Sequence, residues 1–351
     1  MRCTSPRTVG FLADGKTLCW SPKNYSKEYA PFQIPCGKCI ACRLETARQT
    51  AVRCVHEASL YEKNSFITLT YSDENLKSNK LVYKDFQNFV KKLRSHIWDE
   101  KLKELFPNAN TREYRRQLFK ESTKQFQNDI KEKIRISIFA TGEYGDKNKR
   151  PHWHAIIFNW RPSDEKRKYT NSRGDNVYSS DILDQIWSHG FTEIGAVSLH
   201  SAGYCARYAA KKLVHGKDGT HDFNPINRRS CKNAIGKGFI EKYWQDIFRH
   251  GNLLINTDKG KKQCGIPRYY EKWLKKNHPE HWQRYVTQVK QKIINDAVEK
   301  ESKISAKEKL AQFKHDAVNS LKNRQKLFTL NDQKKLNLED KFKQLTKRHK
   351  L

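Results

Sequence analysis

Acidic residues are scarce in this sequence, and long apolar runs are absent. Its 351 residues hold 38 Asp and Glu against 69 Lys and Arg, so the formal net charge is +31 (69 − 38). No run of 18 apolar residues occurs, which excludes a transmembrane helix. The first residues, MRCTSPRTVGF, lack the apolar stretch of a signal peptide. We therefore expect a cytoplasmic protein, with no membrane partner, whose charge attracts polyanions and above all nucleic acid.

Cysteine is abundant, and five of the nine cysteines lie within the first 43 residues. In a reducing compartment, cysteines at close spacing bind metals more often than they form disulfides. Cys36 and Cys39 form the Cys-x₂-Cys knuckle that wraps a tetrahedral Zn²⁺, which needs two further ligands. We favour Cys3, Cys19, Cys36 and Cys39 as the zinc ligands, with Cys42 as a rival for one place. The alternatives are an iron–sulfur cluster and free buried thiols.

Residues 10–17 (GFLADGKT) match the pattern of a phosphate-binding P-loop. Such a loop must follow a buried strand and open a helix. No apolar run precedes these residues, and Ser21-Pro22 stops any helix soon afterwards. We interpret Asp14-Gly15 instead as a hairpin turn between Cys3 and Cys19. Without a P-loop, the chain is not expected to be its own helicase.

Helical spacing and β-branched runs alternate along the chain without a regular βαβ rhythm. Helices are expected at residues 40–61, 85–126 (broken near Pro107) and 201–214, and strands at residues 66–71, 134–140, 152–158 and 191–199. This order predicts an α+β fold with an antiparallel sheet flanked by helices. Residues 281–351 hold 18 Lys and Arg against 8 Asp and Glu, a net charge of +10 (18 − 8), which predicts a basic helical tail.

Two histidines stand in His152-Trp153-His154, within an expected strand. Alternate side chains of a strand share a face, so both imidazoles point one way and Trp153 points into the core with Ile157. Glu143 follows the preceding expected strand, and pairing of the two strands would bring it close to His152. A carboxylate and two imidazoles suit Mg²⁺ or Mn²⁺ that also binds a phosphate. The alternatives are two hydrogen-bonded histidines and an exposed loop carboxylate.

Tyr204 and Tyr208 lie one turn apart on one face of an expected helix. Lys212 extends this face, and Arg207 and Lys211 flank it. The helix therefore offers two phenolic nucleophiles beside cations that favour phenolate and bind phosphate. The alternative is an amphipathic helix that packs a single tyrosine.

These motifs together resemble the replication initiation proteins of gokushoviruses, which are small single-stranded DNA phages. The resemblance covers about residues 1–275 and rests on residues 35–43 (PCGKCIACR), 66–71, 142–145 (GEYG), 151–154 (PHWH), 204–212 and 266–270 (IPRYY). It implies an HUH endonuclease with a central antiparallel sheet of about five strands and the histidines on a central strand. We expect three parts: a cysteine-rich zinc-binding segment (1–43), an HUH endonuclease domain (44–277) and the basic helical tail (278–351).

The resemblance implies that His152, His154 and Glu143 bind the divalent cation and that Tyr204 and Tyr208 are nucleophiles. One tyrosine would cut single-stranded origin DNA, form a 5′-phosphotyrosine and leave a 3′-OH that primes the host polymerase. The second would cut the regenerated origin, and strand transfer would close the circle. Lys212 belongs to this catalytic group, and Arg207 and Lys211 would bind DNA. The implied place is the cytoplasm of the bacterial host, with its replication helicase and polymerase as partners.

Two other hypotheses remain open from the sequence. Net charge and the cysteine cluster fit a non-enzymatic, zinc-containing nucleic-acid-binding protein equally well. The chemistry also fits a two-tyrosine HUH transposase or a plasmid initiator.

Overall fold

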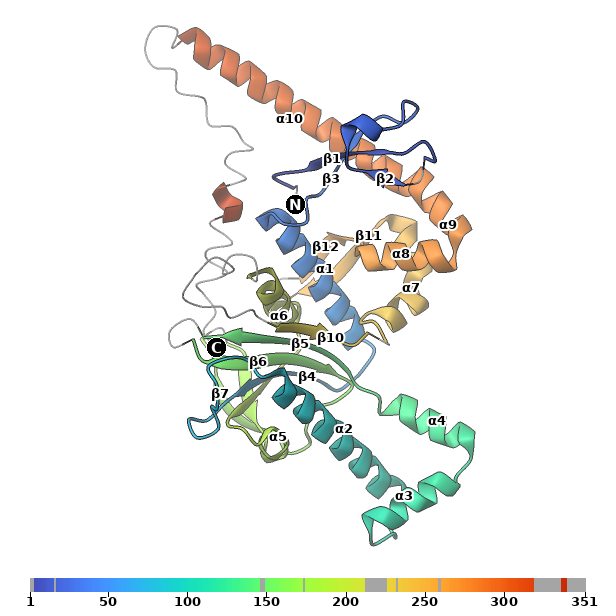
Figure 1. Ribbon diagram of the computed structural model, residues 1–351, viewed down its shortest axis with the longest axis vertical. Helices are drawn as coiled ribbons and strands as arrows, with labels where there is room; N and C mark the ends of the chain where they lie inside the picture. Colours follow the sequence, from blue (N-terminus) through green and yellow to red (C-terminus); the bar gives the residue numbers. More distant parts are fainter. Residues whose placement is uncertain are drawn as a thin grey trace. The chain divides into compact units, whose positions relative to one another are not determined.

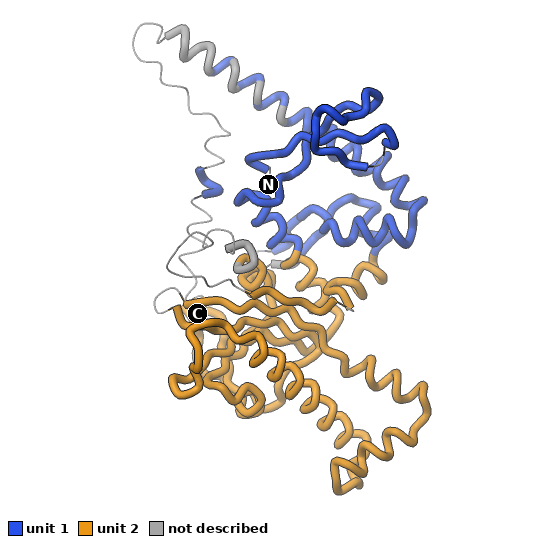
Figure 2. Tube along the Cα trace, in the orientation of Figure 1, with its two compact units in different colours: residues 1–49, 244–351 blue, residues 50–243 orange. Residues whose placement is uncertain are grey.

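The computed structural model describes residues 3–318 and 336–339, apart from residues 16, 146–148, 173, 212–225, 232, 258 and 259. The chain forms two compact units, shown in different colours in Figure 2: unit 1 is residues 1–49 with 244–351, and unit 2 is residues 50–243. Among the described helices, none is long and apolar enough to cross a membrane.

Unit 2 is built on a seven-stranded sheet in which every pair of neighbours is antiparallel. The order is β10 (Ile226–Arg229), β5 (Ser137–Tyr144), β6 (Pro151–Phe158), β4 (Asn64–Thr70), β9 (Thr192–Gly195), β8 (Asn176–Ser179) and β7 (Lys166–Thr170). The α+β class is confirmed, but the expectation of about five strands is wrong. Strands β7, β8 and β10 were not predicted because they are short and their side chains are largely polar.

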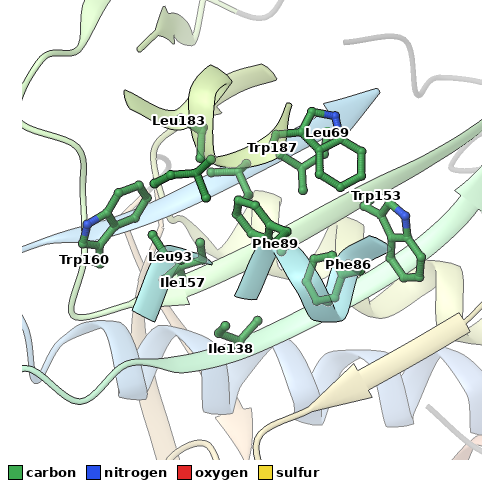
Figure 3. Close-up of a cluster of buried hydrophobic side chains, with 14 of the residues drawn as sticks. Leu69, Phe86, Phe89, Leu93, Ile138, Trp153, Ile157, Trp160, Leu183 and Trp187 are labelled. Atoms are coloured by element: carbon green, nitrogen blue, oxygen red, sulfur yellow. The ribbon is translucent and has the colours of Figure 1, made fainter. Parts of the chain in front are cut away.

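One face of this sheet holds the main hydrophobic core of unit 2. Figure 1 shows α2 (Tyr83–Leu105) and α5 (Asp181–Trp187) on this face. Trp153 and Ile157 of β6 point into the core, as strand alternation predicted, and both are fully buried (Figure 3). The Trp153 ring stacks on Phe86 of α2, with 4.8 Å between ring centroids. This packing leaves the intervening histidines on the opposite face.

Gly142 lies opposite Trp153 in the register of β5 and β6. A Cβ at Gly142 would lie 2.7 Å from Cζ3 of the Trp153 ring and 3.0 Å from Leu81. We expect Gly142→Ala to lower the free energy of unfolding by about 1–3 kcal/mol, because an added methyl group overpacks the core. Gly145→Ala is the matched control, since its Cβ would meet only backbone atoms 3.7 Å or more away. Urea unfolding checks both, and equal stability of the two variants would contradict this packing.

The opposite face of the sheet is covered by a helix from later in the chain. Helix α6 (Leu199–Lys211) packs against β5 and β6 (Figure 1). Its buried residues are small or aromatic, among them Ala202, Tyr204, Cys205 and Ala206. The helix therefore lies close to the sheet and brings its side chains to the face that carries the histidines.

The expected helical stretch after residue 85 consists of three helices, α2, α3 (Arg112–Glu121) and α4 (Lys124–Lys133). Thr111 and Thr123 cap α3 and α4 by accepting hydrogen bonds from backbone N–H groups in the first turn. A separate small core of Leu102, Phe119 and Ile130 holds the three helices together.

Unit 1 contains a small sheet and a group of helices. The sheet has the order β2 (Leu18–Cys19), β1 (Arg7–Phe11), β3 (Phe32–Ile34), and the 3₁₀-helix η1 (Pro22–Asn24) follows β2 in the chain. Separately, β11 (Asn252–Thr257) and β12 (Gly260–Gly265) form a two-stranded hairpin. The helices are α8 (Arg268–Asn277), α9 (Pro279–Arg284), the π-helix η2 (Tyr285–Lys290) and α10 (Gln291–Val318). Two helices are divided between the units. Unit 1 includes α1 (Ile40–Ala58) as far as Gln49 and α7 (Lys237–His250) from Trp244 onward. The expected tail is helical from Pro279 to Val318, and its remainder, apart from residues 336–339, lies outside the described residues.

The turn between β1 and β2 confirms that residues 10–17 are no P-loop. Gly10 and Phe11 pair with Cys19 and Leu18, so a strand follows the turn where a P-loop requires a helix. Gly15 adopts a φ of +61°, which favours glycine. The Thr17 backbone N–H donates to Asp14 Oδ1 at 2.8 Å, which is a hairpin-turn contact.

Candidate metal and nucleophile site

Glu143, His152 and His154 meet on the face of the sheet that α6 covers. Glu143 of β5 is the register partner of His152 of β6, and His154 lies two residues further on the same face. Glu143 Oε1 is 2.9 Å from His152 Nε2 and 2.8 Å from His154 Nε2. Glu143 and His154 are buried, and the His152 side chain is 17% exposed, so the group borders solvent on the His152 side.

The Nδ1 atoms of both histidines are held by neighbouring groups. His152 Nδ1 lies 3.1 Å from the Arg150 carbonyl oxygen, and because a carbonyl only accepts, Nδ1 donates. His154 Nδ1 lies 3.0 Å from Oγ1 of Thr68, its register partner on β4. Both Nε2 atoms therefore face Glu143, an arrangement typical of metal-binding histidines whose other nitrogen is fixed by hydrogen bonding.

The pKa shifts of Glu143 and His154 favour binding of a cation. Burial raises the pKa of Glu143, but hydrogen bonds with His152 and His154 outweigh it, so this pKa lies below its usual value. Burial is the main cause that lowers the pKa of His154. Both shifts favour the ionised carboxylate and the neutral imidazole, which are the forms that bind a metal.

The ligand atoms also fit the size of a divalent cation. All three lie within 4.8 Å of one another. With metal–ligand distances of about 2.1 Å, neighbouring ligands of an octahedral ion are about 3 Å apart, close to the observed 2.8 and 2.9 Å. Glu143 Oε2 is buried and has no hydrogen-bond partner among the described residues. The residues therefore fit Mg²⁺ or Mn²⁺ with coordination positions left for a substrate.

Tyr204 reaches this group from α6. Its hydroxyl lies 3.2 Å from both Glu143 Oε1 and His154 Nε2, and the residue is 5% exposed. Phe66 of β4 stacks on the His154 ring and meets the Tyr204 ring edge-on, so it holds both rings in place. The first tyrosine of the pair thus lies on the same side of the sheet as the histidines.

The other residues predicted on this helix are described only in part. Tyr208 and Lys211 belong to α6, one and nearly two turns after Tyr204, but the structure does not describe their side chains. Lys212 lies outside the described residues. Arg207 is half-buried, and its guanidinium lies against Gly203, where a Cβ would come within 3.1 Å of Nη1.

Thr68 and Phe66 contact His154, but they were not predicted as site residues. The signal that identifies them is strand pairing, since Thr68 pairs with His154 and Phe66 with Ile156, two residues further on the same face. An expected strand at residues 66–71 does not reveal which strand it will pair with. The contribution of Thr68 therefore emerges only from the assembled sheet.

A second group of metal-type ligands lies in unit 1. The thiols that come together are those of Cys3, Cys36, Cys39 and Cys42, all within 4.8 Å of one another. Cys19, which we favoured as a ligand, is not in this group, and its thiol donates to the Ser21 carbonyl. Cys42 takes the fourth place because α1 begins at Ile40, so that one helical turn brings Cys42 back beside Cys39.

The cysteine group has the geometry of a zinc knuckle. The sulfurs of Cys3 and Cys39 are 3.8 Å apart, and a tetrahedral site with Zn–S distances of about 2.3 Å requires about 3.8 Å. The backbone N–H groups of Lys38 and Cys39 donate to Cys36 Sγ. Gly37, at a φ of +73°, allows this turn.

Two of the four cysteines, Cys36 and Cys39, favour the thiolate form, whereas burial raises the pKa of Cys42 to about 12. Hydrogen bonds from the Cys39 and Lys38 backbone lower the pKa of Cys36. Burial raises the pKa of Cys39, yet hydrogen bonds, first among them that with the Thr4 side chain, lower it to about 5. Thiolates are the form of cysteine that binds metal, so the group fits a structural Zn²⁺.

Cysteine variants distinguish the expected zinc ligands from those the structure brings together. We expect Cys42→Ser to reduce bound zinc from about one ion per chain to nearly none, since serine cannot supply a thiolate. Cys19→Ser is the matched control, because Cys19 and Cys42 are equally buried, at 9% and 8% exposed. Metal content measured by mass spectrometry checks this. Zinc retained by the Cys42 variant and lost by the Cys19 variant would contradict it.

Comparisons with known proteins agree with one another. The family described as replication-associated protein ORF2 matches residues 106–213, which include the Glu–His–His group and α6. Replication-associated protein VP4 of Bdellovibrio phage phiMH2K is 44% identical over 292 residues, 83% of this chain and 83% of that protein. Replication-associated protein ORF2 of Spiroplasma virus 4 is 29% identical over 315 residues (84% and 87%), and ORF4 of Chlamydia phage 1 is 27% identical over 254 residues (70% and 54%). No solved structure matches the chain.

Proposed function

Because this chain belongs to the replication-associated proteins of gokushovirus-type single-stranded DNA phages, we propose that it starts rolling-circle replication by nicking one strand of the phage origin. The observation that carries the proposal is the Tyr204 hydroxyl, 3.2 Å from both Glu143 Oε1 and His154 Nε2. A phenolic nucleophile beside a site for a divalent cation is what transfer of a DNA phosphodiester to tyrosine requires.

In the proposed reaction a tyrosine loses its phenolic proton to water, and its oxygen attacks the scissile phosphorus in line. The bond from phosphorus to the 3′ oxygen breaks, the 3′ oxygen leaves as a 3′-OH after taking up a proton, and the 5′ phosphate remains esterified to tyrosine. A cation held by Glu143, His152 and His154 would supply charge neutralisation at a non-bridging oxygen. Glu143 also accepts a hydrogen bond from the Tyr204 hydroxyl, which orients that oxygen.

The second tyrosine of α6 completes the cycle in this proposal. Tyr208 cuts the regenerated origin, and the released 3′-OH attacks the first phosphotyrosine, so that one phosphodiester forms as the tyrosine ester breaks. The cations Arg207, Lys211 and Lys212 orient phosphates, a role that depends mainly on charge. Initiation of this kind takes place in the cytoplasm of the host bacterium, where the 3′-OH primes the host polymerase and a host helicase opens the duplex.

The knuckle of Cys3, Cys36, Cys39 and Cys42 has a structural role in this proposal. A Zn²⁺ held by these thiolates would fix the chain around residue 3 to the start of α1. This role is separate from cleavage because the cysteines belong to unit 1 and the Glu–His–His group belongs to unit 2.

A nicking assay tests the proposed function. The protein is incubated with a single-stranded oligonucleotide that carries the phage origin, with Mn²⁺, with Mg²⁺ or with EDTA. We expect a metal-dependent nick that leaves one product with a free 3′-OH and the other bound to protein. Binding of DNA without any nick under all three conditions would favour a non-enzymatic nucleic-acid-binding protein instead.

A further inference from the structure

A pocket in unit 1 is lined by residues to which no role has been assigned so far. Its volume is about 450 Å³, and its lining residues come from the last turns of α7 and from the segment formed by α9 and η2. That volume is within the range of small-molecule sites. All the residues that line it belong to unit 1.

Aromatic side chains line this pocket. Phe248 and Tyr285 are buried and meet edge-to-face, with 4.9 Å between ring centroids. Trp244 is half-buried and stacks on His278 at 4.2 Å, so its indole is held in one orientation. Trp244, the most exposed of the three, is the ring on which a flat ligand can stack, and the buried Phe248 and Tyr285 keep the lining rigid.

The polar part of the lining is cationic. Arg249 and Arg284 are exposed, and Gln245 and Gln288 also line the pocket. Among the described residues that line the pocket, none is Asp or Glu. The chemistry therefore suits a ligand that is flat at one end and anionic at the other.

The backbone at this pocket is unusual. Tyr285, Gln288 and Val289 lie on the π-helix η2, a conformation that is rare and often found at functional sites. Lys290, the last residue of η2, pairs with Glu271 at 2.7 Å and lies over the Trp282 ring. These contacts fix the wall of the pocket outside the lining itself.

We propose that this pocket binds one nucleotide of single-stranded DNA, with the base stacked on Trp244 and a phosphate between Arg249 and Arg284. Proteins that bind single strands combine aromatic stacking with a basic path for the backbone, and such binding tolerates any base sequence. The proposal rests on the proposed function only in taking DNA as the ligand. It gives unit 1 its own contact with the strand, independent of cleavage.

The first test removes the two arginines. Affinity for a fluorescent oligothymidylate is measured with the full chain, in EDTA and at physiological salt, so that no cleavage occurs. We expect Arg249→Gln with Arg284→Gln to weaken binding about tenfold, because two phosphate contacts are lost. The double variant Lys275→Gln with Lys276→Gln, which removes the same charge from exposed positions of α8, is expected to change it less than twofold. Equal losses in both double variants would overturn the proposal.

The second test locates the base directly. An oligonucleotide that carries 5-iododeoxyuridine is crosslinked to the wild-type protein by ultraviolet light, and the modified peptides are identified. We expect adducts in the peptides that contain residues 244–249 or 281–289. Adducts confined to other peptides would overturn the proposal. Wild-type protein that shows these adducts but never nicks DNA would contradict the proposed function and leave the pocket assignment standing.

Discussion

Replacing Tyr204 and Tyr208 together by phenylalanine is expected to abolish covalent attachment of the protein to DNA. Phenylalanine keeps each ring but removes the only oxygen that can form the ester. The edge-on contact of the Tyr204 ring with Phe66 is retained, so the fold is expected to survive. The measurement is the amount of protein–DNA adduct that resists boiling in detergent, with the origin oligonucleotide and Mn²⁺.

Single variants and a distant tyrosine provide the controls. Tyr114→Phe removes the hydroxyl of an exposed tyrosine on α3 and is expected to leave the adduct unchanged. Each single variant of the pair should still form an adduct if both phenols act as nucleophiles. An adduct that persists in the double variant at the wild-type level would exclude these tyrosines as the nucleophiles.

Replacement of His152 or His154 is expected to reduce nicking nearly as much as replacement of both tyrosines reduces covalent attachment. His152→Ala should lower nicking more than about a hundredfold, because it removes a ligand of the cation on which the reaction depends. Affinity for DNA in EDTA should change little, since most of that affinity comes from the positive charge of the chain. Nicking rates and binding constants measured on the same preparation check this prediction.

Two matched variants show whether the loss is due to the metal. His250→Ala removes an exposed histidine of α7 and is expected to have no effect on nicking. Thr68→Val keeps the shape of the side chain but removes the partner of His154 Nδ1. We expect it to raise the Mn²⁺ concentration for half-maximal nicking about 10–100-fold. A His152 variant that nicks at the wild-type rate would contradict the metal assignment.

Much of the site follows from local rules of the chain. The spacing of His152 and His154 on a strand placed both imidazoles on one face, and the register pairs Glu143 with His152 as expected. The helical spacing placed Tyr204 on α6, whose packing on β5 and β6 brings its hydroxyl to the Glu–His–His group. These predictions succeeded because they depend on strand alternation and helix periodicity.

The features that were missed depend on contacts between distant segments. We favoured Cys19 over Cys42 as the fourth cysteine ligand, and only the start of α1 at Ile40 brings Cys42 into the group instead. Strands β7, β8 and β10 carry mostly polar side chains and gave no apolar pattern. The borders between the three expected parts of the chain, at residues 43 and 277, remain predictions. The roles of Tyr208, Lys211 and Lys212 also remain predictions.

Mapping the protein–DNA adduct by peptide mass spectrometry tests the proposed chemistry most directly. Wild-type protein is incubated with circular single-stranded phage DNA and Mn²⁺, digested with nuclease and protease, and searched for a nucleotide attached to a side chain. We predict the modification on Tyr204 or Tyr208 of α6. A nucleotide attached to any other residue, or DNA that is nicked without a covalent link, would contradict a tyrosine nucleophile beside the Glu–His–His group.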